Sequence, residues 1–145
     1  PFPNASELKE IVLRTTSAEA VEPKQVASWE EIAEIQQAAR NVLVADRVLD
    51  YAVRLILATH PGEHALASVN QYVRAGAGPR GLQALVALAK VRAYLDGRLN
   101  IAFEDIQKVS IPALRHRILL NFEGEASGLS TDQFIAELLQ AVAIE

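Results

Sequence analysis

Apolar residues recur at intervals of three and four along most of the chain, which is the spacing of one face of a helix. Ser, Asn or Pro stands at the start of several of these segments, in some cases with Glu or Gln three residues later, as in a capping box. The pattern therefore predicts six helices. They open at or near Asn4, Ser28, Asp46, Pro79, Phe103 and Ser130.

Residues that interrupt the pattern mark where these helices end. A loose stretch over residues 17–27 separates the first two helices. Pro61-Gly62 stops the third helix, because proline clashes with the preceding turn and removes a backbone donor. For the same reason, Pro112 kinks or restarts the fifth helix before Ile118.

The remaining segments predict little regular structure. Residues 61–78 form the longest stretch without helical spacing, and a connection of that length is usually functional or mobile. Two short apolar runs lie at 42–44 and 99–101, and the sequence leaves open whether they pair as a minimal two-stranded sheet. The predicted fold is an all-α bundle of five to six helices, with Trp29 as an anchor in its core.

Composition agrees with a helical domain and narrows the classes of partner. The 145 residues include 24 alanines and 18 leucines, which are good helix formers, and no cysteine for disulfides or thiolate ligands. A net charge of -4 gives no positive field to gather nucleic acid or an anionic membrane, so neither is expected as a partner. The chain contains no methionine, and we therefore expect a fragment of a longer polypeptide.

No complete active site is visible in the sequence. A phosphate-binding loop needs Gly-Lys followed by Ser or Thr, and none of the four lysines follows a glycine. His60 and His64 have the spacing of two metal ligands on one helix, but Pro61-Gly62 breaks that helix, so no metal site is predicted. Glu104-Asp105 follows an apolar run as magnesium-binding acids do, but acids at a helix N-terminus are the favoured interpretation.

Arg80 is the strongest candidate for a ligand contact. It follows Gly78-Pro79 at the predicted start of a helix, where backbone N–H groups and the helix dipole favour an anion. The rigid, planar guanidinium suits a phosphate group. From spacing alone, an arginine that merely begins a helix remains the more frequent explanation.

Read from end to end, the sequence resembles the C-terminal lid region of a MoxR-type AAA+ ATPase. The segments that carry the resemblance are Pro3-Asn4 through Ile11, Val42-Leu43-Val44-Ala45-Asp46-Arg47-Val48-Leu49-Asp50-Tyr51, Gly76-Ala77-Gly78-Pro79-Arg80-Gly81, Leu95-Asp96-Gly97-Arg98 and Val109 through Ile118. The order and spacing of these segments extend over nearly the whole chain. The sequence departs from the family pattern at Gly78 and Ala45, where Ser is common, and at Phe103, where Pro is frequent.

The resemblance implies that residues 1–145 form a helical lid whose nucleotide-binding core lies elsewhere in the polypeptide. It makes Arg80 the sensor 2 arginine near the γ-phosphate of ATP, with Gly78 and Pro79 shaping the approach. ATP and Mg are then bound mainly by the core, so no cofactor and no activity are expected for this chain alone. Whether Arg80 serves its own subunit's site or its neighbour's stays open.

The resemblance also implies partners and a location. The implied partners are the nucleotide-binding core of the same polypeptide, the neighbouring subunits of a hexameric ring and an unknown client protein. The implied protein is a chaperone-like factor, and its implied location is the cytoplasm. The main alternative is a non-enzymatic helical module that binds a protein partner. A nucleic-acid-binding bundle is a weaker third option, because the arginines are scattered and the net charge is negative.

Overall fold

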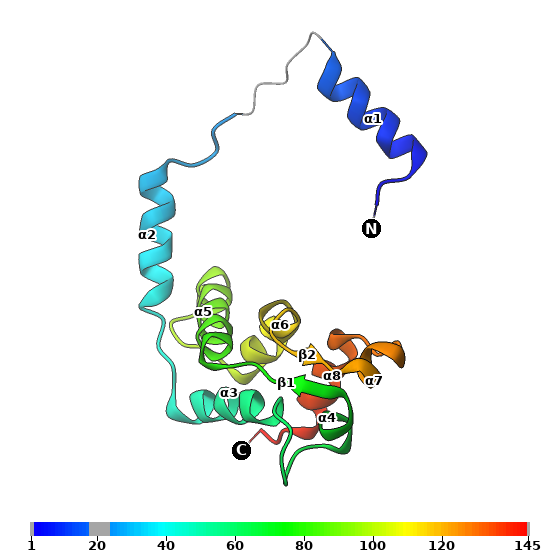
Figure 1. The fold of residues 1–145 in the computed structure, drawn as a ribbon. Helices are drawn as coiled ribbons and strands as arrows, with labels where there is room; N and C mark the ends of the chain where they lie inside the picture. The colour runs from blue at the N-terminus through cyan, green and yellow to red at the C-terminus, as the bar shows by residue number, and fades with distance from the viewer. Residues whose placement is uncertain (1, 18–23, 145) are drawn as a thin grey trace. The chain divides into compact units, whose positions relative to one another are not determined.

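The computed structural model describes residues 2–17 and 24–144, and the chain divides into two units. The first unit is Pro1–Ile32 and the second is Ala33–Glu145. Figure 1 shows the order of the elements along the chain. Most of the loose connection expected at residues 17–27 falls on residues 18–23, outside the described part.

The first unit contains α1 (Ala5–Thr16) and the start of α2 (Trp29–Arg40). Both predicted capping boxes are present. The Asn4 side chain accepts the N–H of Glu7 at 3.1 Å, and the Glu7 carboxylate accepts the N–H of Asn4 at 2.8 Å. Ser28 and Glu31 make the same reciprocal pair at 3.1 and 2.7 Å, so the pattern placed both helix starts correctly.

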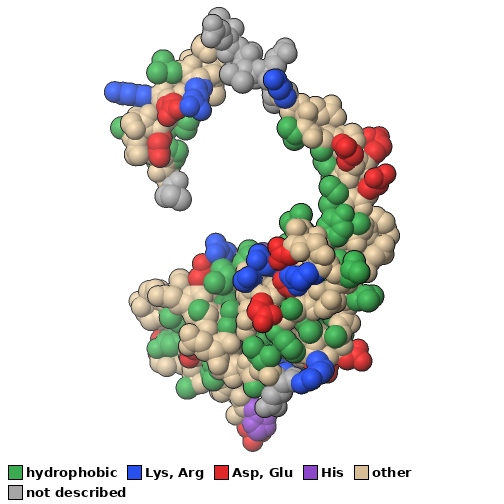
Figure 2. All heavy atoms as spheres, turned by 180° about the vertical axis from the view of Figure 1, so that it is seen from behind, with side chains coloured by type: hydrophobic (Ala, Val, Ile, Leu, Met, Phe, Trp, Pro, Cys, Tyr) green, Lys and Arg blue, Asp and Glu red, His purple; other side chains and the backbone are tan. Residues whose placement is uncertain are grey.

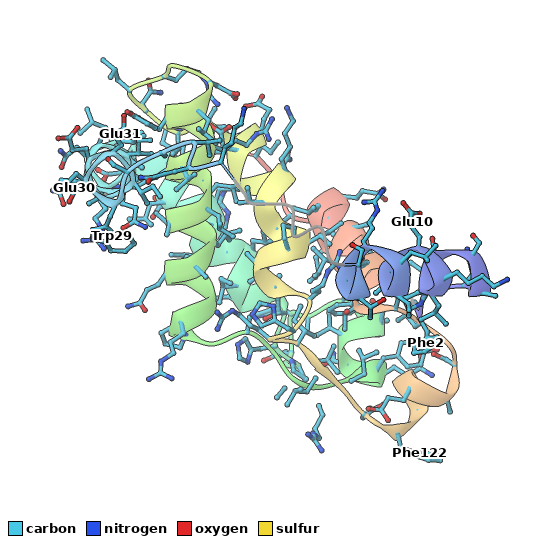
Figure 3. The ribbon with its side chains drawn as sticks, turned by 90° about the horizontal axis from the view of Figure 1, so that it is seen from above. Phe2, Glu10, Trp29, Glu30, Glu31 and Phe122 are labelled. Atoms are coloured by element: carbon cyan, nitrogen blue, oxygen red, sulfur yellow. The ribbon has the colours of Figure 1, made fainter. Side chains whose placement is uncertain are left out.

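Trp29 does not anchor a core, contrary to the prediction. Its side chain is 72% exposed, and Figure 3 shows Trp29, Glu30 and Glu31 spread around the start of α2. In α2, Ala39 is the buried residue, near the opposite end of the helix. An amphipathic pattern identifies the apolar face of a helix, but it does not show which turns of that face are covered.

The core of the second unit is built by α3 (Asp46–Ala58), α5 (Pro79–Leu95), α6 (Phe103–Leu114) and α8 (Thr131–Ala141). Figure 1 shows α5 lying along α6, with α3 at one end and α8 behind. The largest fully buried side chains come from all four helices and include Tyr51, Leu55, Leu85, Ile106, Leu114, Phe134, Ile135 and Leu138. These residues confirm the predicted all-α class.

Two short helices and a small sheet were not predicted. Residues 61–78 hold α4 (Ala67–Tyr72) and β1 (Val73–Ala75), so this segment is not one long loop. β1 pairs antiparallel with β2 (Leu119–Leu120), which leads into α7 (Phe122–Ala126). Elements this short show no period, and α4, β1 and α7 each have a single buried residue: Val69, Val73 and Gly124. The described residues therefore form eight helices rather than five or six.

The pairing of two apolar runs that the sequence left open is present, whereas Pro112 does not restart a helix before Ile118. The runs at 42–44 and 99–101 do pair, through a parallel bridge in which the Leu43 N–H donates to the Leu99 carbonyl at 2.9 Å. Pro112 lies inside the last turn of α6, which ends at Leu114. Ile118 is buried, but it lies beyond the helix. None of the helices within residues 2–17 and 24–144 has the length and apolar character of a membrane-spanning segment.

Candidate functional site

Arg80 occupies the second position of α5, as the sequence predicted. Gly78 is the N-cap residue, with an extended backbone, and Pro79 is the first helical residue. A proline costs no hydrogen bond there, because the first N–H groups of a helix have no partner within it. The helix begins sharply, since the N–H of Gly81 donates to the carbonyl of Gly78 at 2.7 Å. The first turn thus presents Arg80 beside the positive end of the α5 dipole.

The guanidinium of Arg80 is available to a ligand. The residue is exposed, and no hydrogen bond or ion pair joins its side chain to residues 2–17 or 24–144. Arg98 and Arg115 differ from it, because each forms an ion pair with an aspartate. An exposed cation without a protein partner keeps its full capacity to bind an anion.

Two of the three residues predicted to bind nucleotide, Gly78 and Pro79, line an apolar pocket, and Arg80 follows them in the sequence. Gly78 and Pro79 line a pocket of about 270 Å³ directly before Arg80. The rest of its wall comes mainly from the C-terminal half of α3 and the residues on either side of the α5 start: Val53, Ile56, Leu57, His60, Ala77 and Leu82. An apolar recess next to a helix start that carries an unpaired cation suits a ligand with an apolar part and a charged part.

The segment that leads into Arg80 is fixed to the end of α3. The Thr59 hydroxyl, which is fully buried, accepts the N–H of Ala77 at 2.9 Å and donates to the carbonyl of Ile56 at 2.6 Å. The His60 Nε2 lies 3.0 Å from the carbonyl of Ala77. The sequence analysis missed Thr59, because no pattern in one sequence connects a residue to a backbone group 18 positions later.

His60 thus has a backbone partner, the carbonyl of Ala77. Within the part of the chain that the structure describes, no group of three His, Asp or Glu residues is arranged to hold a metal ion. Figure 2 shows basic and acidic side chains lying beside one another on this face of the second unit, without a continuous basic surface.

Asp105, considered above as a magnesium-binding acid, has a structural role. Its side chain is 3% exposed, and its two oxygens accept hydrogen bonds from Arg98, both at 2.6 Å. It also accepts the N–H of Ala102 at 2.8 Å and so caps α6. The Arg98 hydrogen bonds, assisted by the Ala102 N–H, lower the pKa of the Asp105 carboxyl below its usual value. The favoured interpretation as a helix start is confirmed.

Comparison with known proteins places the chain in a family. Residues 65–138 match the family described as the AAA lid domain. Over 144 residues, the chain is 31% identical to the chaperone MoxR1 of Mycobacterium tuberculosis, which covers 99% of this chain. It is 32% identical over 123 residues to the protein MoxR of Methylorubrum extorquens, which covers 81% of this chain.

A solved structure has the same fold. The crystal structure of a putative ATPase from Cytophaga hutchinsonii superposes with a TM-score of 0.82 and 29% identity, over 99% of this chain and 44% of that one. The chain spans only 38% of the length of MoxR1 and 35% of the Methylorubrum MoxR. The family match and these relatives confirm the resemblance drawn from the sequence: this chain belongs to the AAA lid domain family and is of the MoxR type.

Proposed function

We propose that this chain is the lid of a MoxR-type AAA+ ATPase and that Arg80 is its sensor 2 arginine. In this proposal a nucleotide-binding core in the same polypeptide holds ATP and Mg, and Arg80 contacts the γ-phosphate. The observation that carries the proposal is the exposed, unpaired guanidinium in the first turn of α5, beside the pocket that Gly78 and Pro79 line.

The proposed contact acts through electrostatics. Phosphoryl transfer spreads negative charge over the γ-phosphate oxygens, and a cation placed there in advance stabilises the transition state. One such donor is worth about 3 kcal/mol in comparable sites, or a factor on the order of 100 in rate. The dipole of α5 adds to the field at the same point.

The same contact would couple the nucleotide to the position of the lid. α5 packs against both α6 and α3, so a force on its N-terminus acts on the whole second unit. Gain or loss of the γ-phosphate would therefore move the lid as a body. We propose that this movement passes between neighbouring subunits of a cytoplasmic ring that remodels an unidentified client protein, as a chaperone does.

The test is ATP hydrolysis by the complete polypeptide with Arg80→Ala. Turnover should fall about 100-fold with the fold intact, because one transition-state donor is lost. Arg47→Ala is the matched control, since Arg47 is exposed and also stands at the second position of a helix, α3. Equal turnover in the Arg80→Ala variant and the original protein would remove Arg80 from the site.

Mixing subunits decides which site Arg80 serves. Subunits with Arg80→Ala are mixed with subunits whose phosphate-binding loop is disabled. Activity returns in the mixture if Arg80 acts on the neighbouring subunit, because some interfaces then combine an intact loop with an intact arginine. It stays absent if Arg80 acts within its own subunit.

A further inference from the structure

The end of α3 and the start of α5 are joined through both backbone groups of Ala77. Its N–H donates to the Thr59 hydroxyl at 2.9 Å. Its carbonyl lies 3.0 Å from the His60 Nε2, which must be the donor because a carbonyl only accepts. Thr59 and Ala77 are both fully buried, so water does not compete for the hydroxyl contact.

The absence of a side chain at Gly76 lets the backbone before Ala77 lie close to Thr59. A Cβ atom at Gly76 would lie 2.5 Å from the Thr59 Oγ1 and 2.6 Å from the Thr59 carbonyl oxygen. The backbone of residue 76 therefore lies directly against Thr59, with no space for a side chain. Close approach at Gly76 and hydrogen bonding at Ala77 fix two consecutive residues to Thr59, the C-cap residue of α3.

We propose that Thr59, assisted by His60, is a positioning residue that sets the direction in which Arg80 points. The inference rests on the proposed role of Arg80 in ATP hydrolysis. Only Gly78 and Pro79 lie between Ala77 and Arg80, and the proline ring fixes one of the intervening backbone angles. A shift of Ala77 therefore passes to the first turn of α5.

The rest of α5 does not depend on this attachment. Leu85, Ala89 and Ala93 are fully buried and hold the helix in the core. Loss of the Thr59 hydroxyl should therefore leave α5 in place and loosen only its start. Such a displacement matters for catalysis, because a misplacement by about 1 Å can cost on the order of 100-fold in rate.

The test is a double-mutant cycle on ATP hydrolysis by the complete polypeptide. Thr59→Val keeps the shape of the side chain and removes the hydroxyl. We expect kcat to fall about tenfold with KM for ATP changed less than about twofold, and Thr59→Ser to restore kcat. In the Arg80→Ala background, Thr59→Val should have no further effect, because its action passes through Arg80.

Ser110→Ala is the matched control. Its hydroxyl is also fully buried and donates to a carbonyl, that of Ile106, but this hydrogen bond stays within α6 and does not reach the start of α5. It should leave kcat unchanged. A fall in kcat of the same size in Ser110→Ala, or in Thr59→Val combined with Arg80→Ala, would mean a general loss of stability and would overturn the inference.

A second variant keeps the test decisive if Thr59→Val does not fold. His60 is exposed, so His60→Ala should fold, and we expect it to lower kcat about threefold, again only when Arg80 is present. Unchanged kcat in His60→Ala would then overturn the inference. If Arg80→Ala alone leaves turnover unchanged, the proposed function fails; if Arg80→Ala is impaired but Thr59→Val is not, only the positioning role fails.

Discussion

Arg98 donates to both carboxylate oxygens of Asp105, each at 2.6 Å, and this pair ties the loop after α5 to the first turn of α6. The same Arg98 also reaches Asp96 at 3.0 Å, at the end of α5. The Nε of Arg92, on the last turns of α5, lies 3.6 Å from the Asp105 carboxylate. Three contacts thus converge on one connection, and they hold the end of α5 against the start of α6.

Asp105→Asn should make the protein less stable at neutral pH. The native state lowers the pKa of Asp105 below its ordinary value of 3.8, so the ionised form favours folding. That contribution is complete above the unfolded pKa and is lost as the pH falls through the lowered native pKa. We expect a loss of about 2 kcal/mol near pH 7, measured by urea unfolding.

Measuring the free energy of unfolding against pH shows whether Asp105→Asn acts by removing the negative charge or by disturbing the packing around residue 105. Below about pH 4, the original protein loses the contribution of Asp105 and the two stabilities should converge. Asp96→Asn is the control, because Asp96 is 48% exposed and should contribute little. A difference between Asp105→Asn and the original protein that stays constant down to low pH would contradict the role of the charge.

Gly76→Ala should destabilise the second unit. The added methyl group would lie within 2.7 Å of three atoms of Thr59, two of them in the backbone, so the start of α5 must move. We expect a loss of about 2 kcal/mol in thermal or urea unfolding. Gly62→Ala is the control, because nothing lies within 4 Å of its added atom. Equal stability of the two variants would mean that residue 76 has more room than the structure gives it.

The long helices could be predicted from the sequence because their signals are local. Asn4, Ser28 and Ser130 each cap a helix with a partner three residues later, and Pro79 begins one. The β1–β2 sheet joins residues nearly 50 positions apart, and its register depends on tertiary packing that one sequence does not encode locally.

In the candidate site, too, the features with a local sequence signal could be predicted and those that depend on tertiary packing could not. The position of Arg80 in the first turn of a helix follows from Gly78-Pro79, and α5 does begin at Pro79. What holds the preceding residues does not follow, because Thr59 and Ala77 meet only after α3 and α5 have packed. Burial of Thr59 was equally hidden, since threonine is usually exposed.

Ala45→Ser should stabilise the protein. Ala45 is the N-cap residue of α3, with an extended backbone and no side-chain hydrogen bond to the helix. A serine there can accept an N–H from the first turn, which is worth about 1 kcal/mol. Urea unfolding measures the gain, and Ala45→Val, which adds no acceptor, is the control. An equal gain from both substitutions would show that capping is not the cause.

The isolated chain of 145 residues should bind ATP weakly and hydrolyse none. Its sequence contains no Gly-Lys pair for a phosphate-binding loop, so Arg80 would contact a nucleotide that little else holds. One guanidinium and one apolar pocket are consistent with a Kd of about 1 mM or weaker, measured by titration calorimetry. Arg80→Ala should weaken that binding further. Hydrolysis by the purified chain above the level of the Arg80→Ala variant would contradict the division of labour between lid and core, because catalysis would then need no residue outside this chain.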